Sequence, residues 1–338
     1  MNTIEELDKK LSEPSDRLLQ DLADLDGDVM ILGVGGKMGP SLAALAQRTF
    51  QQNGSNKKVY GVSRFSDKSH KKELESQGIV TITADILKEK ELQALPDVKY
   101  VIYLVGTKFG TSGNEHYAWV MNSYLPGRVA EKYRNSNIVV FSTGNVYPLV
   151  HVSTGGSMET GPTGPVGEYA QSCLGRERVF EYFSKTCNTP VLMYRLNYAI
   201  DLRYGVLLEV ARSVYNEEPI DLKTGYANVI WQGDANEIAL RCLKHCNVPP
   251  TVLNVTGPET ISIRWLAHQF GALMDTPPKF LNEEEPTALL SNASKAHRMF
   301  GYPGVTLQQM IEWTTDWVRH DRDTLDKPTH FQQREGKF

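Results

Sequence analysis

The chain has 338 residues, of which 41% are hydrophobic and 22% charged, and its formal net charge at pH 7 is −4. These values are typical of a globular protein with one large α/β domain and a smaller lobe, or with two domains. The acidic balance argues against a protein that binds nucleic acid, and no apolar stretch is long enough to span a bilayer.

The N-terminal segment 1–28 is acidic and lacks the apolar core of a signal peptide, so we expect a cytoplasmic location. Four cysteines in a chain of this size indicate free thiols rather than a disulfide framework. Cys242 and Cys246 flank His245, but two thiols and one poorly placed imidazole do not complete a tetrahedral zinc site. We therefore predict two buried or half-buried thiols on a helix there, and no metal.

Strand-like and helical stretches alternate along the first 200 residues, as in a parallel α/β sheet. Residues 4–25 predict one or two short helices. Strands are predicted at 28–33, 58–62, 80–84, 100–105, 137–142 and 190–196, and helices at 40–51, 69–77, 117–133 and 167–184. Helices at 206–216, 236–246, 263–274 and 307–320 then mix with short strands near Pro219 and Val252. The less regular second part suits a smaller lobe.

A glycine-rich loop follows the first predicted strand and opens a helix. In ILGVGGKMGPSLAALA, Gly33, Gly36 and Gly39 frame Lys37 and Met38. Glycines here serve a tight turn, backbone approach to a pyrophosphate and close helix packing, and the helix N-terminus favours an anion. Because the loop stands in a βαβ unit, we predict a dinucleotide site rather than a purely structural turn.

The end of the second strand indicates which dinucleotide would bind. An acidic residue there would hold the ribose 2′-hydroxyl of NAD, but the chain has Ser63 and Arg64. A guanidinium suits a 2′-phosphate, so NADP is favoured over NAD. Asp85, at the tip of the third strand, is placed to meet the adenine edge. The remaining candidate cofactor residues are Ile86, Val105, Gly106, Lys108 and Asn197.

These features fit a Rossmann-type, doubly wound parallel sheet with a smaller C-terminal α/β substrate lobe. We expect a helical extension over 1–27, a dinucleotide-binding domain over 28–200, and mostly the substrate lobe and C-terminal helices over 201–338.

From about residue 28 to 320 the sequence resembles the extended short-chain dehydrogenase/reductase superfamily, in particular its nucleotide-sugar epimerase/dehydratase group. The resemblance rests on LGVGGKMG, MNSYLPG (121–127), FSTGNVYP (141–148), EYAQSCLGRERVFEYF, RLNYA (195–199), WQGDANEIAL and LNVTGPETISIRWLA. It implies a catalytic role for Thr143, Tyr169 and Asn122, and places Cys173 where the family's Tyr-x-x-x-Lys motif has lysine. It also implies a homodimer formed through the helices at 117–133 and 167–184.

The missing lysine decides how far the chemistry can be predicted. A tyrosine with an ordinary pKa of about 10 needs a nearby cation to act as a base at neutral pH, and a neutral Cys173 cannot provide one. Arg176 or Lys108 could compensate, and reduction, in which Tyr169 donates a proton, would suffer less than oxidation. A nucleophilic Cys173 is disfavoured, because no histidine base or cation is evident beside it.

A second departure from the family's motifs bears on the substrate. In the epimerase-like group an arginine often precedes the V-x-D segment and binds nucleotide-sugar phosphates, but here Asn228 stands near that place. Unless Arg203 or Arg212 takes over, a smaller polyol, sugar acid or keto compound is expected. Residues 109–119, with His116, Tyr117 and Trp119, suit an aromatic-walled pocket, although plain packing explains aromatics equally well.

Two functions remain open. The first is an NAD(P)-dependent epimerase, dehydratase or reductase acting on a carbohydrate-like alcohol or ketone. The second is a catalytically silent NAD(P)-binding protein with a sensing or assembly role.

Overall fold

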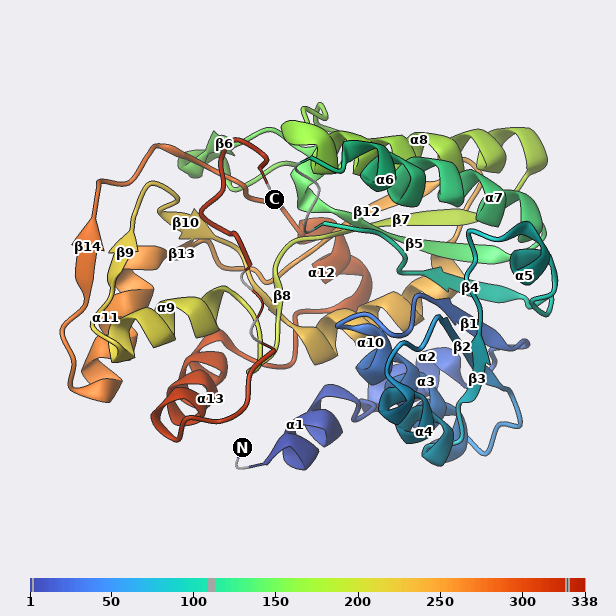
Figure 1. Ribbon diagram of the computed structural model, residues 1–338, viewed down its shortest axis with the longest axis horizontal. Coiled ribbons are helices and arrows are strands. Elements are labelled where there is room, and N and C mark those ends of the chain that lie inside the picture. Colours follow the sequence, from blue (N-terminus) through green and yellow to red (C-terminus); the bar gives the residue numbers. More distant parts are fainter. Residues whose placement is uncertain (2, 109–112, 326, 328, 338) are drawn as a thin grey trace.

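The computed structural model describes residues 1, 3–108, 113–325, 327 and 329–337 (Figure 1). Its centre is a parallel sheet of seven strands in the order β12-β7-β5-β4-β1-β2-β3. The strands are β1 (Val29–Leu32), β2 (Val59–Ser63), β3 (Val80–Thr83), β4 (Tyr100–Tyr103), β5 (Asn137–Thr143), β7 (Val191–Leu196) and β12 (Thr251–Val255). Helices cover both faces, and the predicted doubly wound α/β fold is confirmed.

The helices around this sheet lie in two layers (Figure 1). Along one face run α6 (Glu115–Trp119), α7 (Leu125–Lys132) and α8 (Gly167–Cys187), and along the other α2 (Asp16–Leu22), α3 (Gly39–Gln52), α4 (Lys68–Ser76) and α10 (Gln232–Arg241). The remaining helices are α1 (Ile4–Leu11), α5 (Glu89–Gln93), α9 (Val206–Tyr215), α11 (Ile263–Met274), α12 (Ser294–Phe300) and α13 (Leu307–Arg319).

The strand β1 shows why both faces must be covered. Val29 and Ile31 belong to the hydrophobic cluster on one side of the sheet, and Met30 and Leu32 to the cluster on the other. All four side chains are fully buried, as expected for a strand in a parallel sheet with helices on both faces. Since β1 pairs with both β2 and β4, the winding reverses between β1 and β4. Ligands bind at such a reversal, beyond the carboxyl ends of the strands.

A second core lies beside the sheet, between α9, α11 and α13. Trp231, Phe270 and Trp317 are at its centre, each no more than 1% exposed. Short pairs of strands surround it: β8 (Ala199–Ile200) with β11 (Ile230–Trp231), β9 (Pro219–Asp221) with β14 (Lys279–Leu281), β10 (Tyr226–Ala227) with β13 (Ile261–Ser262), and β6 (Val150–His151) with β15 (Thr287–Ala288). In the described part of the chain, no helix is both long and apolar enough to cross a membrane.

The N-terminal extension contacts both cores. Leu7 and Leu11 of α1 pack into the second core, whereas Leu18 and Leu22 of α2 pack against the sheet. The extension therefore ties the two parts of the molecule together.

Three predicted elements differ in the structure. The helix predicted at 236–246 ends as an α-helix at Arg241, and Cys242–His245 form a 3-10 turn. The helix predicted at 117–133 is interrupted by the π-helical turn η1 (Val120–Tyr124), just before Pro126. Pro126 has no N–H to bond the carbonyl one turn back, which accounts for a disturbance there. The strand expected near Val252 in the smaller lobe is β12, which instead pairs in parallel with β7. Local periodicity identifies a strand but not its partner.

Candidate active site

A cavity of about 380 Å³ lies at the carboxyl ends of β1, β4, β5 and β7. Tyr169 in the first turn of α8, Val206 at the start of α9 and Thr329 in the C-terminal segment also line it. Of the predicted site residues, the structure brings these to the cavity: Gly33, Gly36, Lys37, Met38, Gly39, Gly106, Lys108, Thr143, Tyr169 and Asn197.

On one side of the cavity, the glycine loop packs closely against neighbouring backbone. Gly33 has φ +89°, and a Cβ there would lie 2.9 Å from Val105 Cγ2. A Cβ on Gly39 would lie 2.1 Å from the Val34 carbonyl oxygen, so a side chain cannot be accommodated without a backbone shift. A Cβ on Gly36 would meet its nearest atom at 3.4 Å, an ordinary contact distance. The loop can thus present its backbone closely to a ligand, followed directly by the N-terminus of α3.

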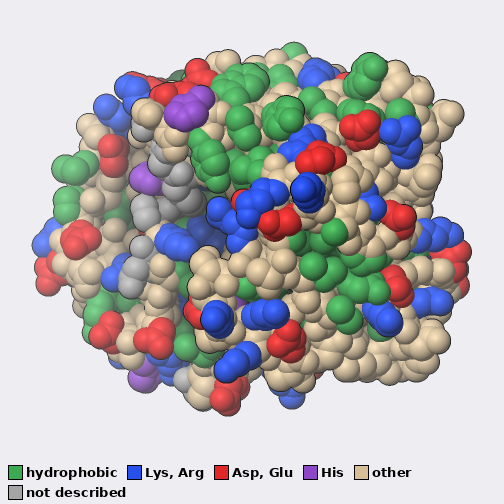
Figure 2. Space-filling model, turned by 45° about the vertical axis from the view of Figure 1, so that its right-hand side comes forward, with side chains coloured by type: hydrophobic (Ala, Val, Ile, Leu, Met, Phe, Trp, Pro, Cys, Tyr) green, Lys and Arg blue, Asp and Glu red, His purple; other side chains and the backbone are tan. Residues whose placement is uncertain are grey.

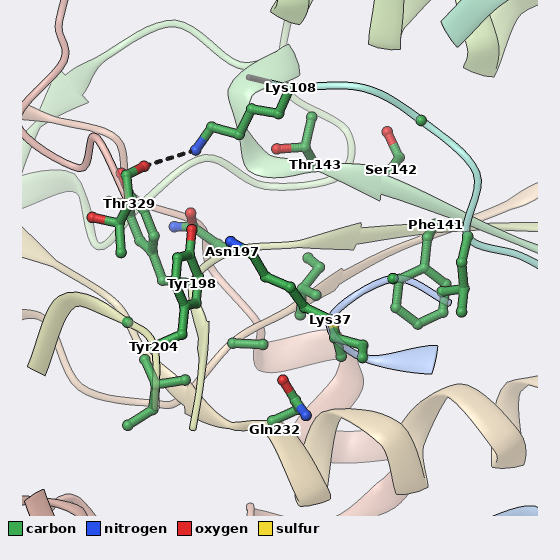
Figure 3. Close-up of a pocket in the computed structure, with 18 of the residues that line it drawn as sticks. Lys37, Lys108, Phe141, Ser142, Thr143, Asn197, Tyr198, Tyr204, Gln232 and Thr329 are labelled. Carbon is green, nitrogen blue, oxygen red and sulfur yellow. Dashed lines mark hydrogen bonds between the residues drawn. The ribbon is translucent and has the colours of Figure 1, made fainter. Parts of the chain in front are cut away.

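Two lysines point into the cavity from different sides (Figure 3). Lys37 Nζ lies 3.1 Å from the ring centroid of Tyr204, and Lys108 Nζ donates a hydrogen bond to the Thr329 carbonyl at 3.0 Å. Burial, and then the charge of Lys108, lowers the pKa of Lys37 to about 7. Burial lowers the pKa of Lys108 to about 8. An anionic ligand would favour the charged form of both amines.

Across the cavity from the glycine loop, Tyr169 and Thr143 lie next to each other. Tyr169 is half-buried in the first turn of α8, and Thr143 ends β5 with 8% of its surface exposed. Burial and the neighbouring Cys173 raise the pKa of Tyr169, while the charge of Arg176 and a hydrogen bond with Thr143 lower it. Burial prevails, so the pKa lies above the ordinary value of a phenol. Tyr169 is therefore protonated at neutral pH and able to donate its proton.

Cys173 follows Tyr169 by one helical turn but does not line the cavity among the described residues. It is fully buried in a small apolar cluster with Val146 and Tyr147. Burial raises the pKa of its thiol, so position 173 carries no charge at neutral pH.

Asn122 lies in the π-helical turn and organises the loop after β4. Its side chain accepts a hydrogen bond from Thr107 N at 2.9 Å and donates to Thr107 O at 2.9 Å and to Ser172 Oγ at 3.0 Å. Its Oδ1 also accepts from Arg176 Nη2 at 2.8 Å. Asn122 is fully buried, so it acts on the site through Gly106, Thr107 and Lys108 rather than by direct contact with the cavity.

Sequence reasoning missed a buried polar network behind the site. Glu177 accepts from Ser142 Oγ at 2.5 Å and is paired with Arg195 at 2.6 and 2.9 Å. Arg195 also donates to the Tyr147 hydroxyl at 2.6 Å, and Tyr147 donates to Asn254 Oδ1 at 2.9 Å. This network links β5, α8, β7 and β12, and so fixes the strand end that carries Thr143.

Five predicted cofactor residues lie outside the cavity lining: Ser63, Arg64, Asp85, Ile86 and Val105. Ser63 packs against the glycine loop, since a Cβ on Gly35 would lie 2.5 Å from its Oγ, and Arg64 is exposed. Asp85 accepts a hydrogen bond from Leu87 N at 3.2 Å within its own turn, and Ile86 is buried in the hydrophobic cluster of that face. Their roles toward a cofactor stay predictions.

Other lining residues were not predicted. Tyr198, Tyr204 and Gln232 form a wall, and Thr329 comes from the C-terminal segment. Thr329 Oγ1 donates to Glu209 Oε2 at 2.7 Å. The motif RLNYA could have indicated Tyr198, which follows the candidate Asn197 directly, but Thr329 lies far along the chain from Gln232, the nearest lining residue in sequence.

The predicted aromatic pocket is not formed by the described part of segment 109–119. Residues 109–112 lie outside the described residues. His116 and Trp119 are exposed, and neither they nor Tyr117 line the cavity.

Asn228 is a structural tie between loops. Its side chain donates to the Glu259 carbonyl at 2.9 Å and accepts from Ser291 N at 2.8 Å, and it is 3% exposed. Arg203 forms ion pairs with Asp8 at 2.9 Å and Asp201 at 2.7 Å. Neither residue lines the cavity.

A family model described as the NAD dependent epimerase/dehydratase family matches residues 29–227 of the chain. Among curated protein sequences, none matches.

Several solved structures share the fold. Pal from Bacillus thuringiensis is 17% identical with a TM-score of 0.71, and the match covers 87% of this chain and all of that one. UDP-glucuronic acid 4-epimerase from Bacillus cereus, in complex with UDP-glucuronic acid and NAD, is 18% identical with a TM-score of 0.69, over 87% of this chain and 99% of that one. UDP-glucose 4-epimerase from Thermus thermophilus, in complex with NAD, is 16% identical with a TM-score of 0.70, over 86% and 99%. At such identities the likeness shows the fold alone.

Proposed function

Because the chain belongs to the NAD-dependent epimerase/dehydratase family, we propose that it is a nicotinamide-dependent oxidoreductase or epimerase acting on a carbohydrate-like alcohol or ketone. One observation carries the proposal: a single cavity joins the glycine loop to the pair of hydroxyls on Thr143 and Tyr169. Binding and chemistry would thus take place in the same space.

The lining of the cavity suits the pyrophosphate and nicotinamide parts of a dinucleotide. Gly33 and Gly39 stand where a Cβ would collide with neighbouring atoms, so the loop backbone is open to a pyrophosphate. Lys37 and Lys108 add positive charge toward an anionic ligand, and Gly106 and Asn197 line the way to Thr143. When bound, the nicotinamide would supply or accept the hydride.

Tyr169 would supply the proton. Its raised pKa keeps the phenol protonated, which suits donation to the oxygen of a carbonyl substrate, and Thr143 would hold that oxygen by hydrogen bonding. In the opposite direction Tyr169 would have to ionise first, which burial opposes. We therefore expect reduction of a ketone to be faster than oxidation of the alcohol at neutral pH.

We also propose a preference for NADP over NAD. The solved relatives described above include complexes with NAD. The preference proposed here rests on Ser63 and Arg64 at the end of β2, which stand where an acidic residue would hold the ribose 2′-hydroxyl of NAD. Titration of nicotinamide fluorescence with NADPH and NADH tests it, and tighter binding of NADH would refute it.

The proposed substrate is a small sugar, sugar acid or keto derivative rather than a nucleotide sugar. Asn228 is occupied by loop contacts, and Arg203 by Asp8 and Asp201, so neither is placed to anchor a diphosphate. A thermal-shift panel in the presence of NADPH would compare free keto sugars with UDP-, GDP- and dTDP-sugars. Stabilisation by a nucleotide sugar but not by the free sugar would overturn this part of the proposal.

We further propose a cytoplasmic homodimer. Trp119, Tyr124 and Tyr182 are large exposed side chains on α6, η1 and α8, at 39, 60 and 62% exposure. Such a surface favours contact with a second copy. Molar mass measured in solution tests the dimer, and a monomer at micromolar concentration would contradict it.

A further inference from the structure

A buried positive charge lies directly beneath the cavity wall, on α8, two helical turns after Tyr169. Arg176 is 6% exposed, and a Cβ on the cavity residue Gly106 would lie 2.5 Å from its Nη2. On its other side the guanidinium carbon lies 5.9 Å from the ring centroid of Tyr103. The guanidinium is thus separated from the cavity only by a residue without a side chain.

Neutral groups hold this guanidinium in place. Nη1 donates to the Phe141 carbonyl at 2.7 Å and Nη2 to Asn122 Oδ1 at 2.8 Å. Nε is buried and has no hydrogen-bond partner among the described residues. Glu177, the next residue, is bonded to Ser142 and Arg195 instead. Burying a cation without a paired carboxylate costs several kcal/mol. A purely structural role would not offset this cost, which indicates that the charge of Arg176 has a function.

The groups around Tyr169 show what the charge can act on. Cys173 and Arg176, on the same helix, both act on the pKa of the phenol, and Thr143 of β5 forms a hydrogen bond with it. Lys108, from the loop after β4, has its Nζ 6.0 Å from the Tyr169 ring centroid. The half-buried amine of Lys108 is partly discharged near neutral pH, because burial lowers its pKa to about 8. Arg176 keeps its charge at every accessible pH.

We propose that Arg176 is the positioning cation of this site: it stabilises the phenolate that Tyr169 becomes when it gives up its proton, and through Asn122 it orders the loop that carries Lys108. The proton leaves Tyr169 Oη for the substrate oxygen. The electron pair of the broken O–H bond stays on the phenolate, which then regains a proton from water. This inference rests on the proposed function, since Tyr169 must be the proton donor.

The experiment measures the ionisation of the Tyr169 phenol directly and requires no substrate turnover. A fluorinated tyrosine placed at position 169 ionises at lower pH than tyrosine, and its 19F resonance reports the titration midpoint in the ligand-free protein. Arg176→Met should raise this midpoint by about one pH unit or more, because a nearby buried cation is removed. Arg176→Lys keeps the charge and should leave the midpoint close to wild type. The matched control is Arg178→Gln, an exposed arginine of the same helix paired with Glu181 at 2.9 Å, which should not move it.

An exchange of the two positions keeps the test decisive if Arg176→Met does not fold. The double variant Cys173→Lys, Arg176→Met returns a cation to the helix one turn earlier and should bring the midpoint back toward wild type. An unchanged midpoint in folded Arg176→Met, or a raised midpoint in both Arg176→Lys and the double variant, would overturn the inference. The expected titration shifts together with no turnover on any substrate would instead refute the proposed function, while the effect of Arg176 on the ionisation of Tyr169 would stand.

Discussion

The two sides of the cavity differ in what determines them: backbone packing on the glycine-loop side, and side-chain charge on the Tyr169 side. On the glycine-loop side, backbone packing determines the structure. Contacts with Val105 and Val34 require Gly33 and Gly39, whatever the charge nearby. On the Tyr169 side, side chains and their charges determine the chemistry. A phenol, a buried thiol and a buried guanidinium follow one another along α8.

The difference fits the resemblance seen in the sequence, in which the glycine loop follows the family's pattern and Cys173 stands where that pattern has lysine. A steric requirement admits few substitutes, because each added atom collides with backbone. An electrostatic requirement can be met from another position, because charge acts over several ångströms. We infer that a cysteine at position 173 leaves the binding side intact, and that a different cation acts on the Tyr169 side.

The largest effect is expected from Gly39→Ala. The new Cβ would lie 2.1 Å from the Val34 oxygen, so the loop must move. We expect the free energy of unfolding to fall by about 3 kcal/mol or more and dinucleotide binding to be lost. Urea unfolding and nicotinamide fluorescence measure the two. Gly36→Ala is the matched control for the unfolding measurement, because its Cβ has room; a wild-type-like Gly39→Ala would show that the loop is not sterically fixed.

Cys173→Lys alone should destabilise the protein. It places a second cation in a fully buried site near Arg176, which costs about 2 to 4 kcal/mol in the free energy of unfolding at neutral pH. Burial would lower the pKa of the new lysine below that in the unfolded chain, so the loss should shrink as pH rises. Cys173→Ala, which adds no charge, is the control. Equal stability of the lysine and alanine variants would contradict the crowding of charge inferred here.

A smaller effect concerns the pH dependence of dinucleotide binding. The pKa of Lys37 is about 7 and that of Lys108 about 8 without ligand, and an anion should raise both. Binding should therefore take up protons above pH 7, and affinity should fall about three- to tenfold between pH 7 and 9. Calorimetry in two buffers of different ionisation enthalpy measures the uptake. Lys37→Met should reduce it, and unchanged uptake in that variant would remove Lys37 from the binding side.

The smallest effect is expected at the edge of the cofactor site. Arg64→Ser should weaken NADPH binding about tenfold and leave NADH unchanged, if the exposed guanidinium pairs with the 2′-phosphate. Fluorescence titration with both dinucleotides decides it. Equal losses for both would indicate a general effect on the loop instead.

Local patterns predicted much of this molecule. The strands β1 to β5 and β7, the glycine loop and the first turn of α8 were all predicted, because each is a short segment with its own periodicity or motif. Pairing across long distances was not: β12 joins β7, and Thr329 reaches the cavity from the C-terminal segment. Spacing along α8 placed Arg176 on the face of Tyr169, but its partners Phe141 and Asn122 come from other elements.

Tyr169→Phe tests the central claim most directly. Wild type and variant would each be loaded with NADPH and mixed with a panel of keto sugars, and the loss of reduced-nicotinamide absorbance would be followed over a single turnover. We predict equal NADPH affinity and a hydride-transfer rate at least about 100-fold lower in the variant, because the phenylalanine has no proton to donate. Equal rates in the two proteins, or failure of the wild type to bind NADPH and NADH, would contradict the account.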